Sequence, residues 1–445
     1  MGLIGGLSGC VLALWGLKSV TKLMPDASTL QANVDARILT FTAAISLLSS
    51  LLLGIAPVLA ANKVHPSPTL KGEAAHSVAS RSLRLTLAKT LTILQVAVSL
   101  VLLILAGLLV RTLANLENQD LGFDREHVLF AHVDPRLAGY HETKLGNLYR
   151  RLLERLNSLP GVRSASFALY SPMSGFTMSI NIGVPGSPPG PEEEMRASID
   201  LVGPRYFETV GTAVVVGREI GSEDTPRSPR VAVVNEAFGH YFFPNQNPLG
   251  RTFILPPNET CEIVGVVRDA KYSELREPPP RMMYLAAVQA QDSQARGIVW
   301  PRNEAGDIVI RTSINPADIA DAVHHAITEV DKNLPLAELT TLRQQVNDSL
   351  GRERLIADLS SLFGLLALVL SCVGLYGVLS YSISRRTTEF GIRMAVGARP
   401  RDISMMVMRD TLVLVGSGIV VGMTGAMTWA RLLSSELFAL APADF

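Results

Sequence analysis

Long apolar runs constrain this chain more than any other feature. A helix crosses a hydrocarbon core about 30 Å thick with roughly 20 mostly apolar residues, because it bonds its own backbone polar groups. Four runs reach this length and a fifth, at the amino end, is slightly shorter. They are Met1 to Leu17, Ile38 to Ala60, Thr90 to Val110, Leu359 to Ile383, and Thr411 to Ala430. We predict an integral protein of the lipid bilayer with five spans.

The run at Met1 has a competing interpretation as a secretory signal peptide. A signal peptide carries its positive charge before its apolar core, whereas Lys18 and Lys22 follow this one. The pattern therefore favours a span. Its abrupt start suggests the tail end of a longer protein, and a genuine short first helix is the alternative.

Basic residues orient the spans, because short loops rich in Lys and Arg stay on the cytoplasmic side. Ala61 to Lys89 and Ser384 to Asp410 are such loops. The less basic loop Lys18 to Arg37 then lies outside, with the amino end inside and the carboxyl end outside. Formal net charge is zero, which argues against a nucleic-acid partner.

The interiors of the five runs contain no Asp, Glu, Lys or Arg. Ion-coupled and proton-coupled pathways need such charges, so the pattern argues against a secondary transporter. Small residues four apart, such as Gly418 and Gly422, allow two helix backbones to approach closely. Glycine is also simply common in membrane helices, which leaves both explanations of the pair open.

Charge and proline concentrate in one polar block from about Leu113 to Ala357, and long apolar runs lie on either side of it. Strand and helix patterns occur near both of its ends. Between them lies a stretch rich in Pro and Gly that contains short β-prone runs. The strand and helix pairs are His127 to Val133 with Glu142 to Leu159 and then Val162 to Leu169, and Asp307 to Arg311 with Pro316 to Val330. The intervening β-prone runs are Arg230 to Val234, Glu262 to Arg268, and Met282 to Ala287. We predict an α+β extracytoplasmic domain with two lobes, one discontinuous and one inserted.

The polar block joins the membrane through helical segments. Arg111 to Gln119 continues one span outward, and Thr341 to Asp358 leads into the next with Leu342, Val346 and Leu350 on one face. A helix continuous from bilayer to domain acts as a rod that transmits displacement. Ordinary interfacial helices are the alternative interpretation.

Motifs of catalysis do not occur in the chain. A phosphate-binding Walker loop requires a Gly-Lys dipeptide, and the sequence has none; H-E-x-x-H, C-x-x-C and G-x-S-x-G are also missing. His324 and His325 are consecutive and cannot share a helix face as zinc ligands do, so we expect them at the surface of an amphipathic helix. We expect no enzyme activity, no cofactor and no metal.

The most distinctive motif, RTTEFGIRMAVGA, spans Arg386 to Ala398 in the second cytoplasmic loop. As a helix it places Glu389 and Arg393 as an i,i+4 pair in the favourable order. Gly397 can end that helix with a left-handed cap, and Pro400 can begin the next one. Insertion into a groove on a partner and association with anionic lipid are equally compatible with this amphipathic helix.

This motif is similar to the cytoplasmic coupling segment of FtsX-like and MacB-like ABC permeases. Further likeness to the MacB-like periplasmic core domain occurs in the family's order, and in all it covers nearly the whole chain. The segments are Leu121-Gly122-Phe123, Leu201 to Gly211, Val231 to Phe238, Pro248-Leu249-Gly250, and Ile263 to Asp269.

The resemblance implies mechanotransmission across a bacterial inner membrane. A separate cytoplasmic ABC ATPase grips the coupling helix, and its closure moves the periplasmic domain through the stalk helices. The permease works as a dimer or an intramolecular pseudo-dimer, with a possible periplasmic or outer-membrane partner. By position, the ATPase contact falls on Arg386, Glu389, Phe390, Gly391, Arg393, Met394, Gly397 and Ala398.

The chain departs from the four-span unit of the family at both ends. It resembles duplicated permeases with two fused halves, and a faint repeat between the opening span and Val413 to Asp444 agrees with this. We expect the last span to begin just beyond Phe445. The expected parts are residues 1–61 as the last two spans of a preceding half, 62–89 as a cytoplasmic linker, 90–112 as a span, 113–357 as the periplasmic core with stalk helices, and 358–445 as the FtsX-like permease domain.

The sequence thus predicts a permease subunit that drives efflux or extraction of an amphipathic substrate. A membrane regulator of a periplasmic enzyme, such as a cell-wall hydrolase, is one alternative. An orphan permease without an ATPase is another.

Overall fold

The computed structural model describes residues 74–140, 142–175, 177–186, 191, 194–290 and 306–432, with the single residues Thr40 and Ala44. The chain divides into two units, residues 1–91 and 92–445. Apart from Thr40 and Ala44, the predicted spans at Met1 to Leu17 and Ile38 to Ala60 lie outside the described residues.

Three long helices form the membrane part of the described chain. They are α3 (Ala74–Glu117), α10 (Gly351–Arg385) and α12 (Pro400–Leu432). Within the described residues these three are long and apolar enough to cross a membrane, and they contain the runs predicted as spans from Thr90, Leu359 and Thr411. Each helix extends beyond its apolar run at one or both ends, since flanking polar residues continue the helical turns.

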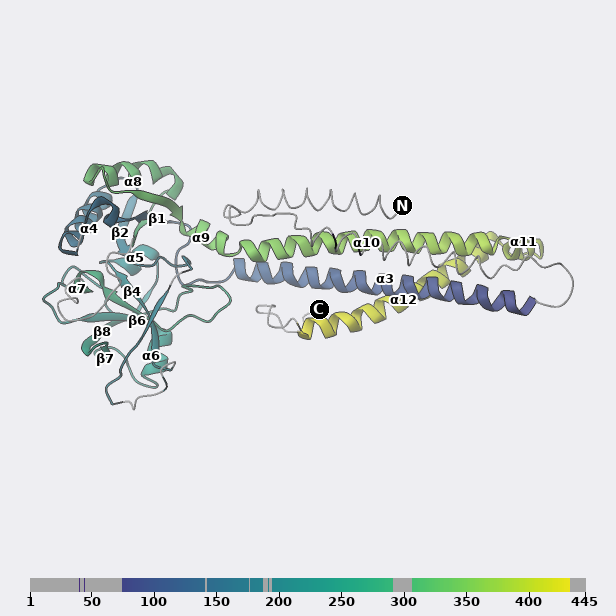
Figure 1. Cartoon of the computed structure of the whole chain (residues 1–445), viewed down its shortest axis with the longest axis horizontal. Helices are drawn as coiled ribbons and strands as arrows, with labels where there is room; N and C mark the ends of the chain where they lie inside the picture. Colours follow the sequence, from purple (N-terminus) through teal and green to yellow (C-terminus); the bar gives the residue numbers. More distant parts are fainter. Residues whose placement is uncertain are drawn as a thin grey trace. The chain divides into compact units, whose positions relative to one another are not determined.

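Glycines bring α12 and α10 against α3, as Figure 1 shows for the three helices. A Cβ placed on Gly422 of α12 would lie 2.8 Å from the carbonyl oxygen of Ala97, and one on Gly418 would lie 2.8 Å from Cβ of Val96. On α10, Ser371 donates a hydrogen bond from Oγ to the carbonyl of Gln95 at 3.2 Å. The predicted small-residue pair therefore makes a helix contact, because only glycine leaves room for this approach.

The polar block folds around a mixed sheet of 11 strands. The hydrogen-bonded order is β11-β1-β10-β2-β4-β9-β6-β8-β5, with β3 on β4 and β7 on β8. The strands are β1 (Val128–Val133), β2 (Val162–Ala168), β3 (Met178–Asn181), β4 (Arg196–Val202), β5 (Val214–Gly217), β6 (Val231–Asn235), β7 (Thr252–Leu255), β8 (Glu259–Val267), β9 (Met282–Ala286), β10 (Gly306–Thr312) and β11 (Leu336–Thr341). The helices of this block are η2 (Pro135–Ala138), α4 (Glu142–Asn157), α5 (Tyr206–Val210), α6 (Glu236–Phe242), α7 (Ala287–Ala290), α8 (Pro316–Val330) and α9 (Leu342–Ser349).

The sheet has two halves that match the predicted lobes. Strands β11, β1, β10 and β2 come from both flanks of the insertion, and β4, β9, β6, β8 and β5 come from within it. The halves meet where β2 pairs with β4 through the single pair Ala168 and Val202. The two lobes are thus parts of one continuous sheet with a narrow connection.

Helices α4 and α8 cover the flanking half, as Figure 1 shows. Leu148, Leu152 and Leu156 of α4 are fully buried with Val323 of α8, as the spacing of three and four predicts. Asn315 caps α8 by accepting a hydrogen bond from the backbone N–H of Ala317. His324 and His325 are exposed on α8, as expected.

The segment that leads from β11 into the membrane is helical but interrupted. Helix α9 ends at Ser349, and Leu350 caps both α9 and α10. Leu342, Val346 and Leu350 are buried in one apolar cluster with Leu116 near the end of α3, which confirms that the three share a face. The expected single rod is therefore two helices joined at Leu350, with the first one embedded in the domain core.

Candidate functional site

The candidate site is the segment between α10 and α12, which its basic residues predict to be cytoplasmic. Helix α10 ends at Arg385, and α11 (Thr387–Ala395) follows after one residue. That residue, Arg386, donates its backbone N–H to the carbonyl of Ile383 and places its guanidinium 3.3 Å from Asp410 of α12. An ion pair thus anchors the start of α11 to the next span.

Helix α11 has one face turned to the protein. Phe390 is 7% exposed, and Arg393 places Nη1 3.7 Å from Sδ of Met406 on α12. Glu389 accepts a hydrogen bond from Nη2 of Arg393 at 2.6 Å, as the i,i+4 spacing predicts. Phe390 was expected to contact the partner. Because its side chain is buried, it packs inside the chain and is not part of an accessible contact surface.

The opposite face of α11 is apolar and open. Ile392 is 62% exposed and Val396 is 84% exposed, and the spacing of four puts them on the same side. Gly391 is also exposed, and a Cβ added there would meet no atom within 4 Å. Glycine within a helix costs about 1 kcal/mol relative to alanine, and no packing inside the described chain requires it here. This face is thus suited to close approach of another molecule.

The segment that ends α11 is ordered by its own backbone. Gly397 adopts φ +107°, and its N–H donates to the carbonyl of Met394 at 3.1 Å. Ala398 donates to the carbonyl of Arg393 at 3.0 Å, so two orphan carbonyls are satisfied. Asp402 then accepts a hydrogen bond from the backbone N–H of Arg399 at the start of α12. The predicted glycine stop and proline start are confirmed.

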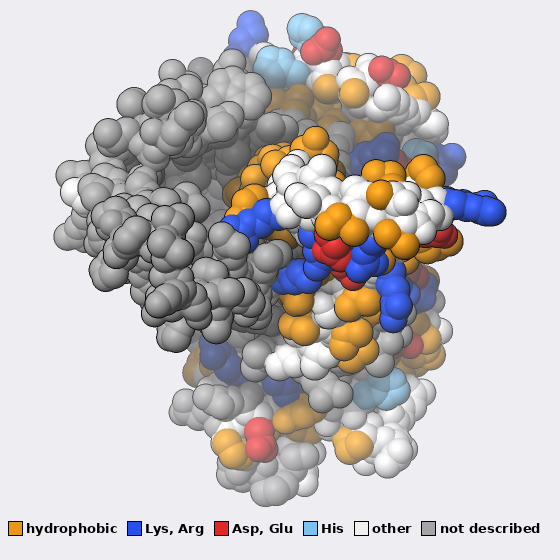
Figure 2. All heavy atoms as spheres, turned by 90° about the vertical axis from the view of Figure 1, so that its right-hand side faces the viewer, with side chains coloured by type: hydrophobic (Ala, Val, Ile, Leu, Met, Phe, Trp, Pro, Cys, Tyr) orange, Lys and Arg blue, Asp and Glu red, His pale blue; other side chains and the backbone are white. Residues whose placement is uncertain are grey.

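Basic side chains surround this segment. Figure 2 views the chain from the side on which α11 lies in Figure 1, and it shows Lys or Arg side chains gathered around acidic ones, with hydrophobic side chains beside them. Within the described residues, the ion pairs of the segment are Arg386 with Asp410 and Arg393 with Glu389. Arg401 and Arg409 add further exposed positive charge.

A second group of polar side chains lies at the other end of the spans, where they meet the domain. Arg354 of α10 contacts Glu117, the last residue of α3, through Nε at 3.1 Å and Nη2 at 2.8 Å. The same Nη2 lies 3.1 Å from Oδ1 of Asn347 on α9. Arg125 donates to the carbonyl of Glu117 at 2.7 Å. These contacts tie α3, α9 and α10 together at one level.

The loop between β8 and β9 reaches the same level. Arg276 of this loop lies 3.6 Å from Glu353 of α10, and Leu275 is buried in the cluster that contains Leu116 of α3. The backbone N–H of Lys271 donates to the carbonyl of Leu121, just beyond α3. The inserted half of the domain therefore contacts α10 directly and shares an apolar cluster with the end of α3.

The structure brings the eight predicted site residues into one segment, with Phe390 inside and the others at least partly accessible. Sequence reasoning missed Ile392 and Val396, although their spacing of four inside the motif was a usable signal. It also missed Glu117 and Arg354, which are 237 positions apart and carry no local signal. Within the described residues, no group of three or more His, Cys, Asp and Glu side chains is placed to hold a metal ion.

Comparison with protein families agrees with this arrangement. Residues 90–330 match the MacB-like periplasmic core domain, and residues 361–443 match the FtsX-like permease C-terminal domain. The chain belongs to the MacB-like, FtsX-like family of ABC transporter permeases. In this chain the matched core domain lies between helices that are long and apolar enough to cross a membrane.

Curated relatives of this ABC permease include larger proteins. It is 26% identical over 233 residues to the macrolide export ATP-binding/permease protein MacB of Aggregatibacter actinomycetemcomitans, which covers 51% of this chain and 34% of that protein. It is 26% identical over 247 residues to MacB of Burkholderia pseudomallei (strain 1710b), which covers 53% of this chain and 36% of the relative. The chain thus spans about a third of the length of these relatives.

Solved structures similar to this permease include two extracytoplasmic domains. The periplasmic region of MacB from Actinobacillus actinomycetemcomitans matches with 16% identity and a TM-score of 0.35, over 52% of this chain and 95% of that structure. The extracellular domain of the noncanonic ABC-type transporter YknZ from Gram-positive bacteria matches with 13% identity and a TM-score of 0.31, over 48% of this chain and 98% of that structure.

Proposed function

We propose that this permease transmits the work of a separate cytoplasmic ABC ATPase to its periplasmic domain, and thereby drives efflux or extraction of an amphipathic substrate. The open apolar face of α11 is the observation that carries the proposal. Ile392 and Val396 expose apolar surface there beside Gly391, which is the surface a groove on a partner can take up.

A single helix, α10, connects the segment of α11 to the domain. The Arg386–Asp410 pair fixes the start of α11 to α12, and a single residue separates α11 from α10. Helix α10 then runs for 35 residues, about 52 Å at 1.5 Å per residue. This exceeds the roughly 30 Å hydrocarbon thickness, so one helix reaches from the cytoplasmic segment to the level of Arg354. Movement of α11 is passed on because the intervening part is a single stiff element.

At its periplasmic end, α10 is connected to the domain in two ways, and either connection can pass on its movement. Leu350 links α10 directly to α9, whose buried Leu342 and Val346 lie in the domain core. Glu353 and Arg354 contact the inserted half through Arg276 and helix α3 through Glu117. A displacement of α10 relative to α3 therefore acts on the two halves of the sheet differently.

Export as the direction of the work is supported by the names of the relatives. The spans themselves carry no charged residue in their interiors, which accords with a substrate handled on the periplasmic side. The chain contains no Gly-Lys dipeptide, so nucleotide hydrolysis is assigned to another polypeptide or to another part of a longer one.

Co-purification tests the assignment of α11. Candidate ABC ATPases are co-expressed with the full chain, and retention on the tagged permease is measured. We expect Ile392→Glu to abolish retention, because it places a charge in the apolar contact. Leu137→Glu, at a 75% exposed leucine of the periplasmic domain, is the matched control and should retain the ATPase. Retention by Ile392→Glu equal to that of the wild type would refute the coupling role.

Membrane sidedness tests the route. Single cysteines at Ala398 and at Asn258 of the inserted half are labelled in sealed inside-out vesicles with a membrane-impermeant maleimide. We expect label only on the cysteine at Ala398. Labelling of both positions from the same side contradicts transmission across the bilayer.

A further inference from the structure

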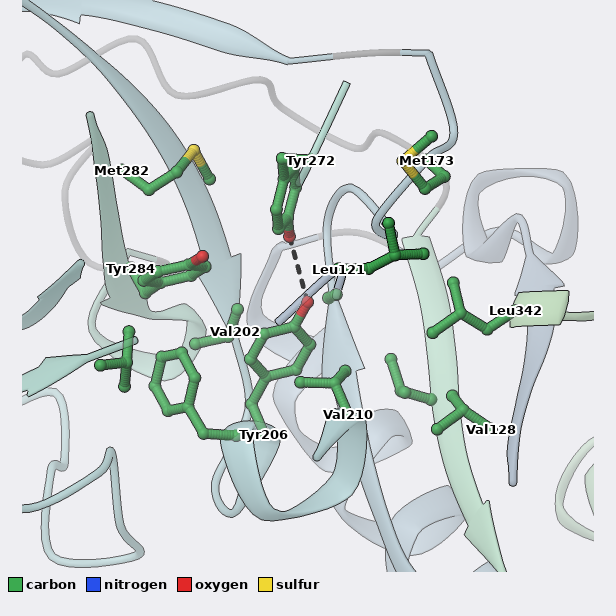
Figure 3. Close-up of a cluster of buried hydrophobic side chains, with 14 of the residues drawn as sticks. Leu121, Val128, Met173, Val202, Tyr206, Val210, Tyr272, Met282, Tyr284 and Leu342 are labelled. Carbon is green, nitrogen blue, oxygen red and sulfur yellow. Dashed lines mark hydrogen bonds between the residues drawn. The ribbon is translucent and has the colours of Figure 1, made fainter. Parts of the chain in front are cut away.

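A carboxyl group is buried in the apolar centre of the domain. Asp200 lies on β4 and is fully buried. Its neighbours on the strand, Ile199 and Leu201, face one apolar cluster, so Asp200 points with Val202 into the other. Figure 3 shows that second cluster, in which Tyr206, Tyr272 and Tyr284 surround Val202. An ionised carboxylate is costly in such surroundings.

The hydrogen bonds around Asp200 allow its protons to be counted. The hydroxyl of Tyr272 has three oxygen neighbours: Oδ2 of Asp200, the carbonyl of Tyr170 at 2.8 Å, and the hydroxyl of Tyr206 at 3.1 Å. Figure 3 marks the last of these bonds. A phenol has one proton to donate, and a carbonyl only accepts. If Tyr272 donates to Tyr170, its contact with Asp200 needs a proton from the carboxyl group.

A protonated Asp200 satisfies every contact in this network. Asp200 then donates from Oδ2 to Tyr272, Tyr272 donates to the carbonyl of Tyr170, and Tyr206 donates to Tyr272. The other oxygen, Oδ1, accepts from the backbone N–H of Tyr170 at 3.1 Å. An ionised Asp200 instead leaves one proton for two acceptors, so either the Tyr170 contact or the Asp200 contact becomes a repulsion between lone pairs.

Other charged groups near this network point away from it. The ammonium of Lys271 donates to the carbonyl of Glu277, and the carboxylate of Asp269 accepts from Asn235 and from the N–H of Ala237. The groups that face Asp200 are the phenols of Tyr272 from the β8–β9 loop, Tyr206 from α5 and Tyr284 from β9. Within the described residues, no cation is among its contacts.

The network lies where the two halves of the sheet join. Beside the single pair of β2 and β4, Leu169 donates to the carbonyl of Leu201 at 2.9 Å, and the bonds of Asp200 to Tyr170 extend that connection by one residue. Oγ of the next residue, Ser171, accepts a hydrogen bond from Nε2 of Gln345 on α9 at 3.2 Å. Tyr272 itself belongs to the loop that contacts α10 directly and shares an apolar cluster with the end of α3.

We propose that Asp200 is a proton-binding site that keeps the two halves of the periplasmic domain joined when it is protonated and loosens their connection when it ionises. The proposal does not depend on which ATPase or substrate the permease serves. It makes the joint between the stalk and the inserted half sensitive to pH on the outer side of the membrane.

Linkage gives the sign of the effect. Burial raises the pKa of Asp200 to about 7. The native state therefore binds this proton more tightly than the unfolded chain, whose value is about 3.9. Stability must fall as the pH rises between these two values and then level off. The asparagine variant, which mimics the protonated carboxyl, should lack this component.

Infrared difference spectroscopy of the full chain in lipid detects the proton directly. We expect a carboxylic-acid band at pH 5 that disappears with a midpoint near neutral pH. Asp200→Asn should remove this band. Asp224→Asn is the matched control, because Asp224 is also hidden from solvent but pairs with Arg218, and this pairing lowers the pKa of its carboxyl. A band that survives in Asp200→Asn overturns the proposal.

Two further measurements keep the test decisive if Asp200→Asn does not fold. Tyr272→Phe removes the hydroxyl that accepts the hydrogen bond from the protonated Asp200. It should therefore shift the frequency of the carboxylic-acid band, and an unshifted band refutes the assignment of that band to Asp200. For the variants that fold, the midpoint of thermal unfolding is compared between pH 5 and pH 8. The pKa of His132 is raised by its hydrogen bond to Asp307, so this residue also contributes to the pH dependence of stability. It is common to all variants, so their difference reports Asp200.

Discussion

Replacing Gly422 by alanine tests whether α12 is held against α3 by backbone contact. A Cβ at this position would lie 2.8 Å from the carbonyl oxygen and 3.0 Å from Cα of Ala97. Both atoms belong to a helix backbone and cannot move out of the way without moving α3. The added methyl group therefore has to push the two spans apart.

The size of the effect follows from two opposing contributions. Overpacking by one methylene-sized group costs about 1–3 kcal/mol. Alanine is intrinsically better than glycine in a helix by about 1 kcal/mol. Gly416 lies on the same helix, and a Cβ there would meet nothing within 4 Å. Gly416→Ala should therefore be neutral or stabilising, and Gly422→Ala should be less stable than Gly416→Ala by about 1–3 kcal/mol.

The assay is thermal unfolding of the full chain in one detergent, followed for both variants under identical conditions. Gly422→Val should lower the midpoint further than Gly422→Ala, because it adds two more methyl groups in the same space. Equal midpoints for Gly416→Ala and Gly422→Ala would show that α12 does not rest on α3 at this position.

Three further predictions concern the domain and its junction. Gly122→Ala should lower the unfolding midpoint, because φ is +80° and the new Cβ collides with the carbonyl of Asp269; a midpoint unchanged from the wild type contradicts this. Leu152→Ala should cost about 2–5 kcal/mol in chemical denaturation, since Leu152 is fully buried, and a cost below that range contradicts close packing of α4. Arg354→Gln should cost less than about 1 kcal/mol, because both partners are half-exposed, and a double-mutant cycle with Glu117→Gln should recover a coupling of that size.

Local patterns in the sequence were sufficient for the long apolar helices and for part of the domain, whereas β3, β4, β5, β7 and β11 were not predicted. The spans near Thr90, Leu359 and Thr411 follow from length and hydropathy alone, because the bilayer sets the length of a spanning helix. Strands β1, β2 and β10 and helices α4 and α8 of the flanking half follow from periodicity, and α11 follows from its ion pair and its glycine stop. Each of these signals lies within a few turns of the residue that it places.

The contacts that give the candidate site its properties were not predictable in this way. Glu117 meets Arg354 across 237 positions, and Phe390 is inside rather than on the surface, although nothing in its own helix distinguishes it. In the sequence, nothing distinguishes Asp200 from an exposed charged residue. It is buried because β4 pairs with β9 and because Tyr272, 72 positions along the chain, contacts it.

The sequence by itself determined which described segments are long and apolar enough to cross a bilayer, where several strands and helices of the domain lie, and which loop carries the expected coupling motif, because these depend on neighbours along the chain. The tertiary structure alone decided how the spans rest on one another, how α10 meets both halves of the domain, and which carboxyl group keeps its proton. Those properties depend on distances and desolvation between segments far apart in the sequence, and no local pattern encodes them.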